Sequence, residues 1–145
     1  NSEQAKLNLR PRLRMATLYA VAQSVDENGQ PNNGRVCCTG NRCESIVGYC
    51  TLWGDLAGDF APLAILTKRE VCELGKFMGL PDRLVFKAPS DGLTGKTDEE
   101  SLGITYTQIE DYLANKPLEP EVAKKITEMA GRNQLKREII RIPHP

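Results

Sequence analysis

The segment "CTGNRCE", residues 38 to 44, combines residue types that suit phosphate and metal binding. Thr39 and Gly40 lie at the end of a predicted strand and just before a predicted helix, where α/β proteins place ligands. Free N–H groups at a helix N-terminus favour a phosphate, and the carboxylate of Glu44 suits Mg²⁺. From the spacing alone a structural role is the better interpretation, with Thr39 capping the helix and Glu44 favouring its dipole.

A second candidate is "TLWGDLAGD", residues 51 to 59. Asp55 and Asp59 are four residues apart in a loop that contains glycine, and Trp53 lies beside them. Such a loop can present carboxylates and an aromatic face to a ligand. The alternative is an ordinary surface turn in which Trp53 fills the core.

Basic residues form a third group of candidates. Lys68 follows Thr67 in the first turn of a predicted helix, where a cation opposes the helix dipole. An anionic ligand at that position would compensate for the unfavourable interaction between the Lys68 charge and the helix dipole, and exposure to solvent would weaken it. The other basic candidates, which suit either a phosphate or solvent, are Arg10, Arg12, Arg14, Lys136 and Arg137.

The elements that position these residues are mostly helical. The sequence predicts a buried strand at 35–39 and helices that begin near Asn8, at Arg42, after Thr67, after Thr105 and at Pro120. Asn8 is expected to cap the first helix, with Pro11 in its first turn. T-x-x-E and T-x-x-Q patterns mark capping boxes at Thr67 and Thr105, and Gly131 is expected to stop the last helix.

This pattern predicts an α/β fold, a partial doubly wound parallel sheet flanked by helices. One strand is too few for such a sheet, so we expect the remaining strands upstream of Asn1. Length and composition, with 145 residues and 40% hydrophobic, are sufficient for one domain. The chain begins at Asn1 rather than Met, and we therefore expect a fragment or a processed product.

Charge and cysteine content narrow the class of protein. Nineteen basic residues balance nineteen acidic ones, so no global field favours nucleic acid or a membrane. No apolar run approaches the ~18 residues of a membrane span, and no signal peptide is found. Five cysteines without a C-x-x-C pair indicate small thiols in a reducing compartment rather than a zinc site, and we expect a cytoplasmic protein.

Several blocks, taken in order, resemble the C-terminal half of the synthetase domain of NAD synthetases. They are "NLRPRLRM", "CTGNRCESIVGYCTLWGDLAGD", "LTKRE", "KAPSDGLTGKTDEESLGITYTQIEDYL" and "LKRE". The resemblance covers residues 8 to about 141. It implies the adenine-nucleotide α-hydrolase-like fold and ATP-dependent amidation of deamido-NAD, through an adenylate, with release of AMP and pyrophosphate.

The resemblance also implies roles for individual residues. Thr39, Lys68 and Ser90 would contact ATP, and Glu44 would bind Mg²⁺. Three further residues would hold deamido-NAD, namely Arg12, Asp59 and Lys136. No catalytic residue is assigned, because the reaction asks the protein mainly to position its substrates and to stabilise charge.

The sequence departs from the family at three places. Leu52 stands where some members carry Lys, and Leu135 precedes Lys136 where members often carry His. The S-G-G-x-D-S phosphate loop is absent from the 145 residues. We therefore expect the chain alone to be inactive.

The resemblance implies an organisation for the chain. Residues 1–145 form the C-terminal part of the domain, 87–104 an active-site lid, and 132–145 a tail. The lid is expected to exclude water from the adenylate and to be disordered without ligand. Ammonia, in some members delivered by a glutaminase domain, would be the second substrate, and the protein would be a homodimer.

A protein of another class fits the same residues. A non-catalytic nucleotide-binding or dimerisation module could have kept the late motifs and lost the phosphate loop. The upstream reading frame separates the two hypotheses, because only the enzyme needs a phosphate loop there.

Overall fold

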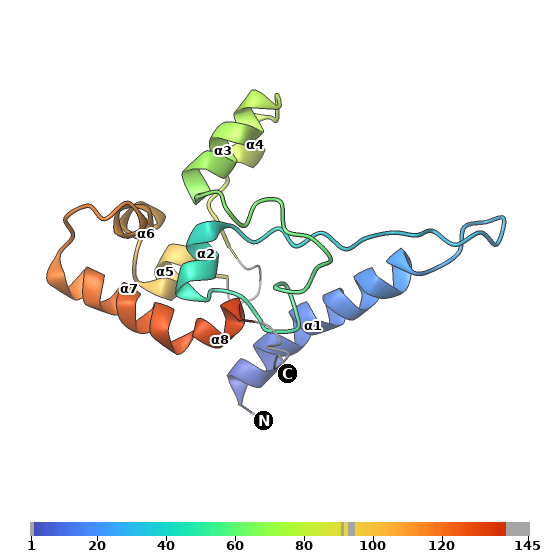
Figure 1. Ribbon diagram of the computed structural model, residues 1–145, viewed down its shortest axis with the longest axis horizontal. Coiled ribbons are helices and arrows are strands. Elements are labelled where there is room, and N and C mark those ends of the chain that lie inside the picture. The colour runs from blue at the N-terminus through green and yellow to red at the C-terminus, as the bar shows by residue number, and fades with distance from the viewer. Residues whose placement is uncertain (1, 91, 93–94, 139–145) are drawn as a thin grey trace, which may run out of the picture. The chain divides into compact units, whose positions relative to one another are not determined.

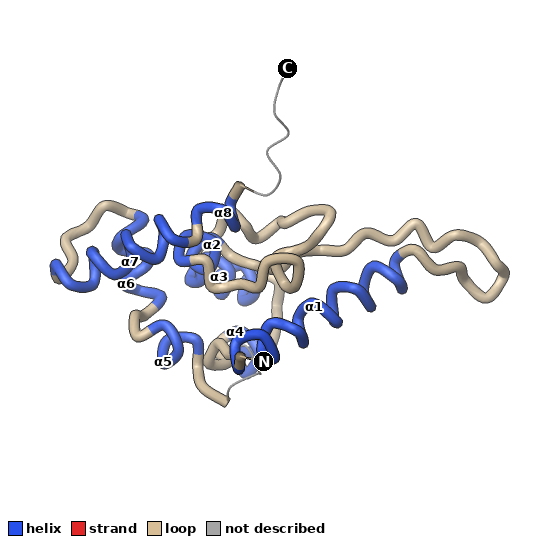
Figure 2. Tube along the Cα trace, turned by 90° about the horizontal axis from the view of Figure 1, so that it is seen from below, coloured by secondary structure: helices blue, strands red, loops and turns tan. Residues whose placement is uncertain are grey.

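The computed structural model describes residues 2–90, 92 and 95–138. The described residues form helices and no strand, as the tube trace shows (Figure 2). The chain divides into two compact units, residues 1–40 with 49–64 and residues 41–48 with 65–145. The helices are α1 (Glu3–Ala22), α2 (Arg42–Val47), α3 (Lys68–Phe77), α4 (Asp82–Val85), α5 (Asp98–Leu102), α6 (Tyr106–Leu113), α7 (Pro120–Arg132) and α8 (Gln134–Arg137) (Figure 1).

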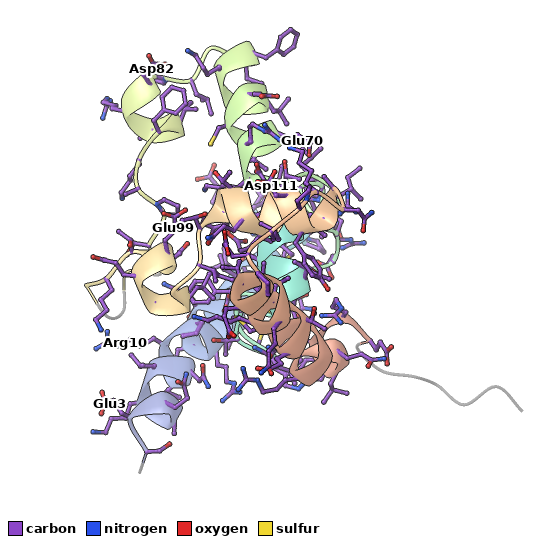
Figure 3. All side chains as sticks on the ribbon, turned by 90° about the vertical axis from the view of Figure 1, so that its left-hand side faces the viewer. Glu3, Arg10, Glu70, Asp82, Glu99 and Asp111 are labelled. Carbon is purple, nitrogen blue, oxygen red and sulfur yellow. The ribbon has the colours of Figure 1, made fainter. Side chains whose placement is uncertain are left out.

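In the first unit, α1 begins earlier than predicted. Ser2 is its N-cap and accepts a hydrogen bond from the backbone N–H of Ala5 at 3.2 Å. The prediction that Asn8 caps this helix is wrong, since the Asn8 side chain instead accepts from the Thr51 hydroxyl at 3.0 Å. Pro11 is therefore buried inside the helix rather than in its first turn. Figure 3 shows Glu3 and Arg10 projecting outward from α1.

The strand predicted at 35–39 does not form. This segment makes only an isolated parallel bridge, between Cys37 and Phe60. Its backbone hydrogen bonds run from Cys38 N to Phe60 O at 2.9 Å and from Asp59 N to Val36 O at 2.7 Å. A strand needs a continuous ladder with a neighbour, and the described residues do not supply one. The parallel sheet therefore stays a prediction.

The core of the second unit is built around α2. This short helix packs against α6, α7 and α8. Cys43 of α2, Ile109 of α6 and Ile126 of α7 are completely buried, and Val47 of α2 is 1% exposed. Each large aliphatic side chain buried in this way stabilises the fold by about 1.5–3 kcal/mol.

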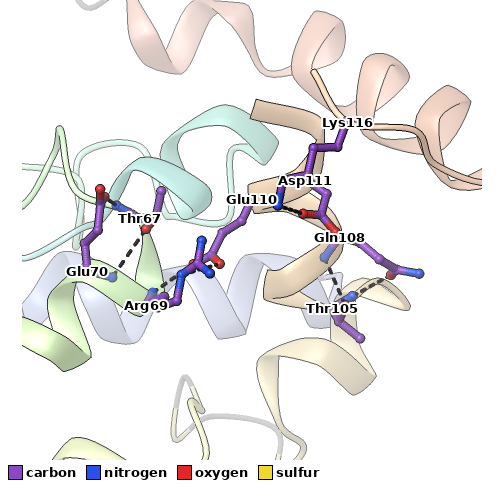
Figure 4. A network of polar contacts seen from close by, with 8 residues as sticks. All are labelled: Thr67, Arg69, Glu70, Thr105, Gln108, Glu110, Asp111 and Lys116. Carbon is purple, nitrogen blue, oxygen red and sulfur yellow. Dashed lines mark hydrogen bonds and ion pairs between the residues drawn. The ribbon is translucent and has the colours of Figure 1, made fainter. Parts of the chain in front are cut away.

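The helix starts of the second unit agree with the predicted capping boxes. Thr67 accepts from the N–H of Glu70 at 3.3 Å, and the Glu70 carboxylate accepts from the N–H of Thr67 at 2.7 Å. Thr105 and Gln108 form the same reciprocal pair at α6 (Figure 4). The predicted stop at Gly131 is wrong, because α7 starts at Pro120 but continues to Arg132.

The C-terminal end of α2 is held by side chains from the end of the described chain. Gly48 ends the helix with a left-handed φ of 69°, and a Cβ there would collide with the side chain of Asn133. Asn133 donates to the carbonyl of Val47 at 3.0 Å and Lys136 to that of Gly48 at 2.6 Å. Arg137 donates to the carbonyl of Ile46 at 3.0 Å. These donors satisfy carbonyls that a helix end leaves unpaired.

Candidate functional site

Glu44 is positioned by the first turn of α2. Asn41, rather than Thr39, is the N-cap, and its side chain accepts from the Glu44 N–H at 3.0 Å. The Oε2 atom of Glu44 accepts from the Asn41 N–H at 2.9 Å. The capping role considered for Thr39 is therefore wrong, and Thr39 is exposed. One carboxylate oxygen of Glu44 is fixed by the backbone, which leaves Oε1 for another partner.

That partner is Tyr106, at the start of α6. Its hydroxyl lies 3.2 Å from Glu44 Oε1 and 2.9 Å from Asp98 Oδ2. Tyr106 is 6% exposed and Asp98 is 5% exposed. The Tyr106 backbone N–H donates to the carboxylate of Glu99 at 2.8 Å. Three helices, α2, α5 and α6, thus bring two carboxylates to one phenol.

The cluster of Glu44, Asp98 and Tyr106 brings two carboxylates together in a largely buried place. Burial raises the pKa of Glu44 although the Asn41 N–H and the Tyr106 hydroxyl favour its charged form. Burial, followed by the charges of Glu44 and Asp98, raises the pKa of Tyr106. Asp98 Oδ1 is buried and has no hydrogen-bond partner among the described residues. Such an orphaned carboxylate oxygen is costly unless a cation joins it.

Lys68 faces this cluster. It is the first residue of α3, and its ammonium lies 5.7 Å from the centroid of the Tyr106 ring, within range of a cation–π interaction. The start of α3 is fixed on α6, because Glu110 accepts from the N–H of Arg69 at 2.8 Å and also pairs with its side chain at 3.5 Å (Figure 4). The unfavourable lysine at the helix start is thus explained by a partner outside its own helix.

Arg12 and Asp59 belong to the first unit. Arg12 Nε donates to the backbone carbonyl of Leu52 at 3.2 Å. Asp59 accepts from the N–H of Val36 at 2.7 Å. Desolvation and then the charge of Asp59 raise the pKa of Tyr19. Arg12, on α1, thus contacts the loop at 51–59, and Asp59 at the end of that loop contacts the segment at 35–39.

Trp53, Ser90 and Lys136 complete the predicted set. Trp53 is 48% exposed and has a left-handed φ of 60°, so it does not fill the core. The Ser90 hydroxyl donates to the carbonyl of Lys96 at 3.0 Å and accepts from the N–H of Gly92 at 3.2 Å. Lys136 lies in the second unit, against Gly48 at the end of α2.

The predicted lid, residues 87–104, contains α5 and ends in the buried residues Leu102 and Ile104. Its C-terminal part is therefore helical, and the role of the segment as a lid stays a prediction. Residues 91, 93 and 94 of this segment lie outside the described residues.

Tyr106 and Asp98 were not predicted as site residues. Both lie in the block "KTDEESLGITY", but neither residue's type or spacing indicates that it is buried beside Glu44. Among the described residues, no group of three or more His, Cys, Asp or Glu side chains could hold a metal ion by itself. None of the described helices is long and apolar enough to cross a membrane.

Comparisons with known proteins agree on one family. The family model described as NAD synthase matches residues 1–140. The NH(3)-dependent NAD(+) synthetase of Carboxydothermus hydrogenoformans is 41% identical over 140 residues, which are 96% of this chain and 55% of that protein. The chain thus spans about half the length of the curated relatives it matches.

Solved structures give the same result. The match to the NMN synthetase of Francisella tularensis covers 99% of this chain and 58% of the Francisella chain, with 39% sequence identity and a TM-score of 0.86. The match to the NAD+ synthetase of Burkholderia pseudomallei covers 92% of this chain and 48% of the Burkholderia chain, with 36% sequence identity and a TM-score of 0.66.

Proposed function

Because the chain belongs to the NAD synthase family, we propose that it forms part of an ATP-dependent ligase that amidates deamido-NAD to NAD. The observation that carries the proposal is the cluster of half-buried Glu44 with buried Asp98 and Tyr106, with Lys68 beside it. Clusters of this kind stabilise charge that develops on phosphates once a cation is bound.

The reaction takes place in two steps. A nicotinate carboxylate oxygen attacks the α-phosphorus of ATP, the bond to the β-phosphate oxygen breaks, and pyrophosphate leaves. Ammonia then attacks the carboxyl carbon of the adenylate, loses a proton to form the amide, and AMP leaves. Both steps depend on holding the reacting atoms together without water.

The residues of the second unit divide this work. Lys68 brings a positive charge for the phosphates of ATP, and Ser90 offers a hydroxyl at the edge of the lid. Glu44 and the orphaned oxygen of Asp98 are hard oxygen donors of the kind that Mg²⁺ prefers, so these residues fit the ion. When bound, Mg²⁺ neutralises charge on the transferring phosphate.

The first unit contributes to the binding of the nucleotide. Thr39 has an exposed hydroxyl for ATP, and Arg12 and Asp59 are the proposed contacts to deamido-NAD. Lys136, which belongs to the second unit, is the third proposed contact to deamido-NAD. We further propose a cytoplasmic homodimer that takes free ammonia, as the names of its NH(3)-dependent relatives suggest, with delivery by a glutaminase domain as the alternative.

A second candidate substrate is nicotinate mononucleotide. The likeness to the NMN synthetase of Francisella tularensis has a TM-score of 0.86, against 0.66 for the Burkholderia NAD+ synthetase. Leu52 favours this substrate as well, because it lacks the charge that some NAD synthetases carry at this position, where the family resemblance implies a contact to the dinucleotide. The product would be nicotinamide mononucleotide, formed through the same adenylate chemistry.

The test measures amide formation from ATP, Mg²⁺ and ammonia with either deamido-NAD or nicotinate mononucleotide. It uses the chain alone and the chain extended by its own upstream reading frame. Since the S-G-G-x-D-S loop is not among the 145 residues, activity is expected only in the extended protein, and Glu44→Ala should abolish it. The ratio of kcat/KM for the two substrates identifies the physiological one.

Failure of the extended protein to form either product would contradict the proposal that the chain is part of a ligase. If it still bound ATP, the non-catalytic nucleotide-binding or dimerisation module would be favoured instead. Activity that survived Glu44→Ala would remove Glu44 from the proposed site.

A further inference from the structure

Tyr106 is shared by two carboxylates. Its hydroxyl lies within hydrogen-bond distance of Glu44 and of Asp98, yet a phenol has one proton to donate. It can therefore satisfy only one of the two at any moment. The other carboxylate oxygen facing the hydroxyl needs a different positive partner.

The two carboxylates are held in different ways. The Glu44 carboxylate accepts from the Asn41 N–H at 2.9 Å. Asp98 is the first residue of α5, and its backbone N–H donates to the carbonyl of Pro89 at 3.0 Å, while its side chain is buried and accepts from the Tyr106 hydroxyl. Moving either carboxylate away would break the contact to Asn41 or expose Asp98, so the two groups stay close together.

The positive charge near the cluster does not replace the missing partner. Lys68 lies over the face of the Tyr106 ring, at 5.7 Å from its centroid. The buried Oδ1 of Asp98 has no hydrogen-bond partner among the described residues. A small cation that bonds directly to carboxylate oxygen would relieve both the repulsion and the unsatisfied atom.

We propose that Tyr106 is a positioning residue that, together with Asp98, orients the Glu44 carboxylate toward a divalent cation. The inference rests on the proposed function, because that function assigns the cation to Glu44. When the Tyr106 hydroxyl donates to Glu44 Oε1, it sets the direction of that carboxylate, and Asp98 then lacks the proton and offers its negative charge to the cation. Partners of this kind commonly change metal affinity by about 10- to 100-fold when removed.

The test measures Mn²⁺ binding to the chain by electron paramagnetic resonance, without any turnover. Tyr106→Phe removes only the hydroxyl, and we expect it to raise the Kd for Mn²⁺ about tenfold. Tyr112→Phe is the matched control on the same helix, since its hydroxyl lies 3.1 Å from the Thr127 hydroxyl and away from the two carboxylates. The control should bind Mn²⁺ like the unchanged chain.

A second variant keeps the test valid if Tyr106→Phe does not fold. Asp98→Asn keeps the shape of the side chain and removes its charge, and it should also weaken Mn²⁺ binding about tenfold. An unchanged Kd in a folded Tyr106→Phe or Asp98→Asn protein would overturn the proposal. So would an absence of Mn²⁺ binding in the unchanged chain, or an equal loss in Tyr112→Phe.

Activity of the extended protein separates this inference from the proposed function. Tyr106→Phe should raise the Mg²⁺ concentration needed for half-maximal rate and leave the KM for deamido-NAD or nicotinate mononucleotide nearly unchanged. A residue with a merely structural role would lower the unfolding temperature without this selective change. Mn²⁺ binding that depends on Tyr106 in a protein that forms neither product would support the cation site and refute the ligase.

Discussion

Glu44 and Glu70 occupy the same position in two capping boxes, yet their pKa values shift in opposite directions. Glu70 is exposed, and its hydrogen bonds from the backbone and side chain of Thr67 lower its pKa. Glu44 makes the corresponding bond to Asn41, but burial dominates and raises its pKa. A glutamate that served only as a cap would gain nothing from burial. This difference singles out Glu44 among the capping glutamates of the chain.

Glu44→Gln tests the cost of that burial. The amide can accept from the Asn41 N–H and donate to the Tyr106 oxygen, whose proton then serves Asp98. Because the buried negative charge is removed, the free energy of unfolding should stay the same or rise by up to about 1 kcal/mol. Chemical denaturation of the chain at pH 7 measures this. Catalysis by the extended protein should be lost, and a large destabilisation would contradict the argument.

Local spacing places Glu44 near a helix start but does not predict its neighbours. The carboxylate follows the "TGN" turn by a few residues, so sequence alone places it near a helix start. Tyr106 is 62 residues away from Glu44, and its contact depends on how α2 and α6 pack. No periodic pattern carries that information. Thr39 was misassigned as a possible cap for a simpler reason, namely that Asn41, with Glu44 three residues later, fits the same rule better.

At the scale of the helix, the capping boxes make stability depend on acid pH. Bonds from the Thr67 and Thr97 groups lower the pKa of Glu70 and of Glu100 below the usual 4.5. A carboxyl whose pKa is lower in the folded state stabilises the fold above its unfolded pKa and loses this effect as the pH falls through its folded pKa. The unfolding temperature should therefore fall as the pH is lowered from about 5 toward 3.

The double variant Glu70→Gln, Glu100→Gln checks this dependence. Glutamine also completes a capping box, as Gln108 does at α6, but it does not titrate. Thermal melts followed by circular dichroism should show a weaker decline at acid pH in the variant than in the unchanged chain. Identical profiles would mean that other carboxyl groups determine the acid sensitivity.

The helices were predicted better than the strand because their signals are local. A threonine with Glu or Gln three residues later satisfies donors within one turn, and this holds whatever surrounds the helix. The segment at 35–39 has the composition of a strand, but a strand exists only with a partner. Phe60 supplies a single bridge, and the described residues offer no further ladder.

For the molecule as a whole, stability should depend on a few buried side chains of the second unit. Ile109 is fully buried, whereas Phe77 is 89% exposed. Ile109→Ala should therefore cost about 2–5 kcal/mol of unfolding free energy, and Phe77→Ala should change it by no more than about 0.5 kcal/mol. Urea titrations of both variants measure the difference. A large loss in Phe77→Ala would show that this side chain is covered in solution.

The side-chain donors that hold the C-terminal end of α2 are synthesised long after the helix itself. These donors, Asn133, Lys136 and Arg137, follow their acceptors by 86 to 91 residues. A ribosome that adds about 5–20 residues per second needs roughly 5 to 18 s to make that stretch. Until then the three acceptor carbonyls lack their side-chain donors, and a transcript cut short before the codon for Asn133 would yield a nascent chain that cannot complete this unit.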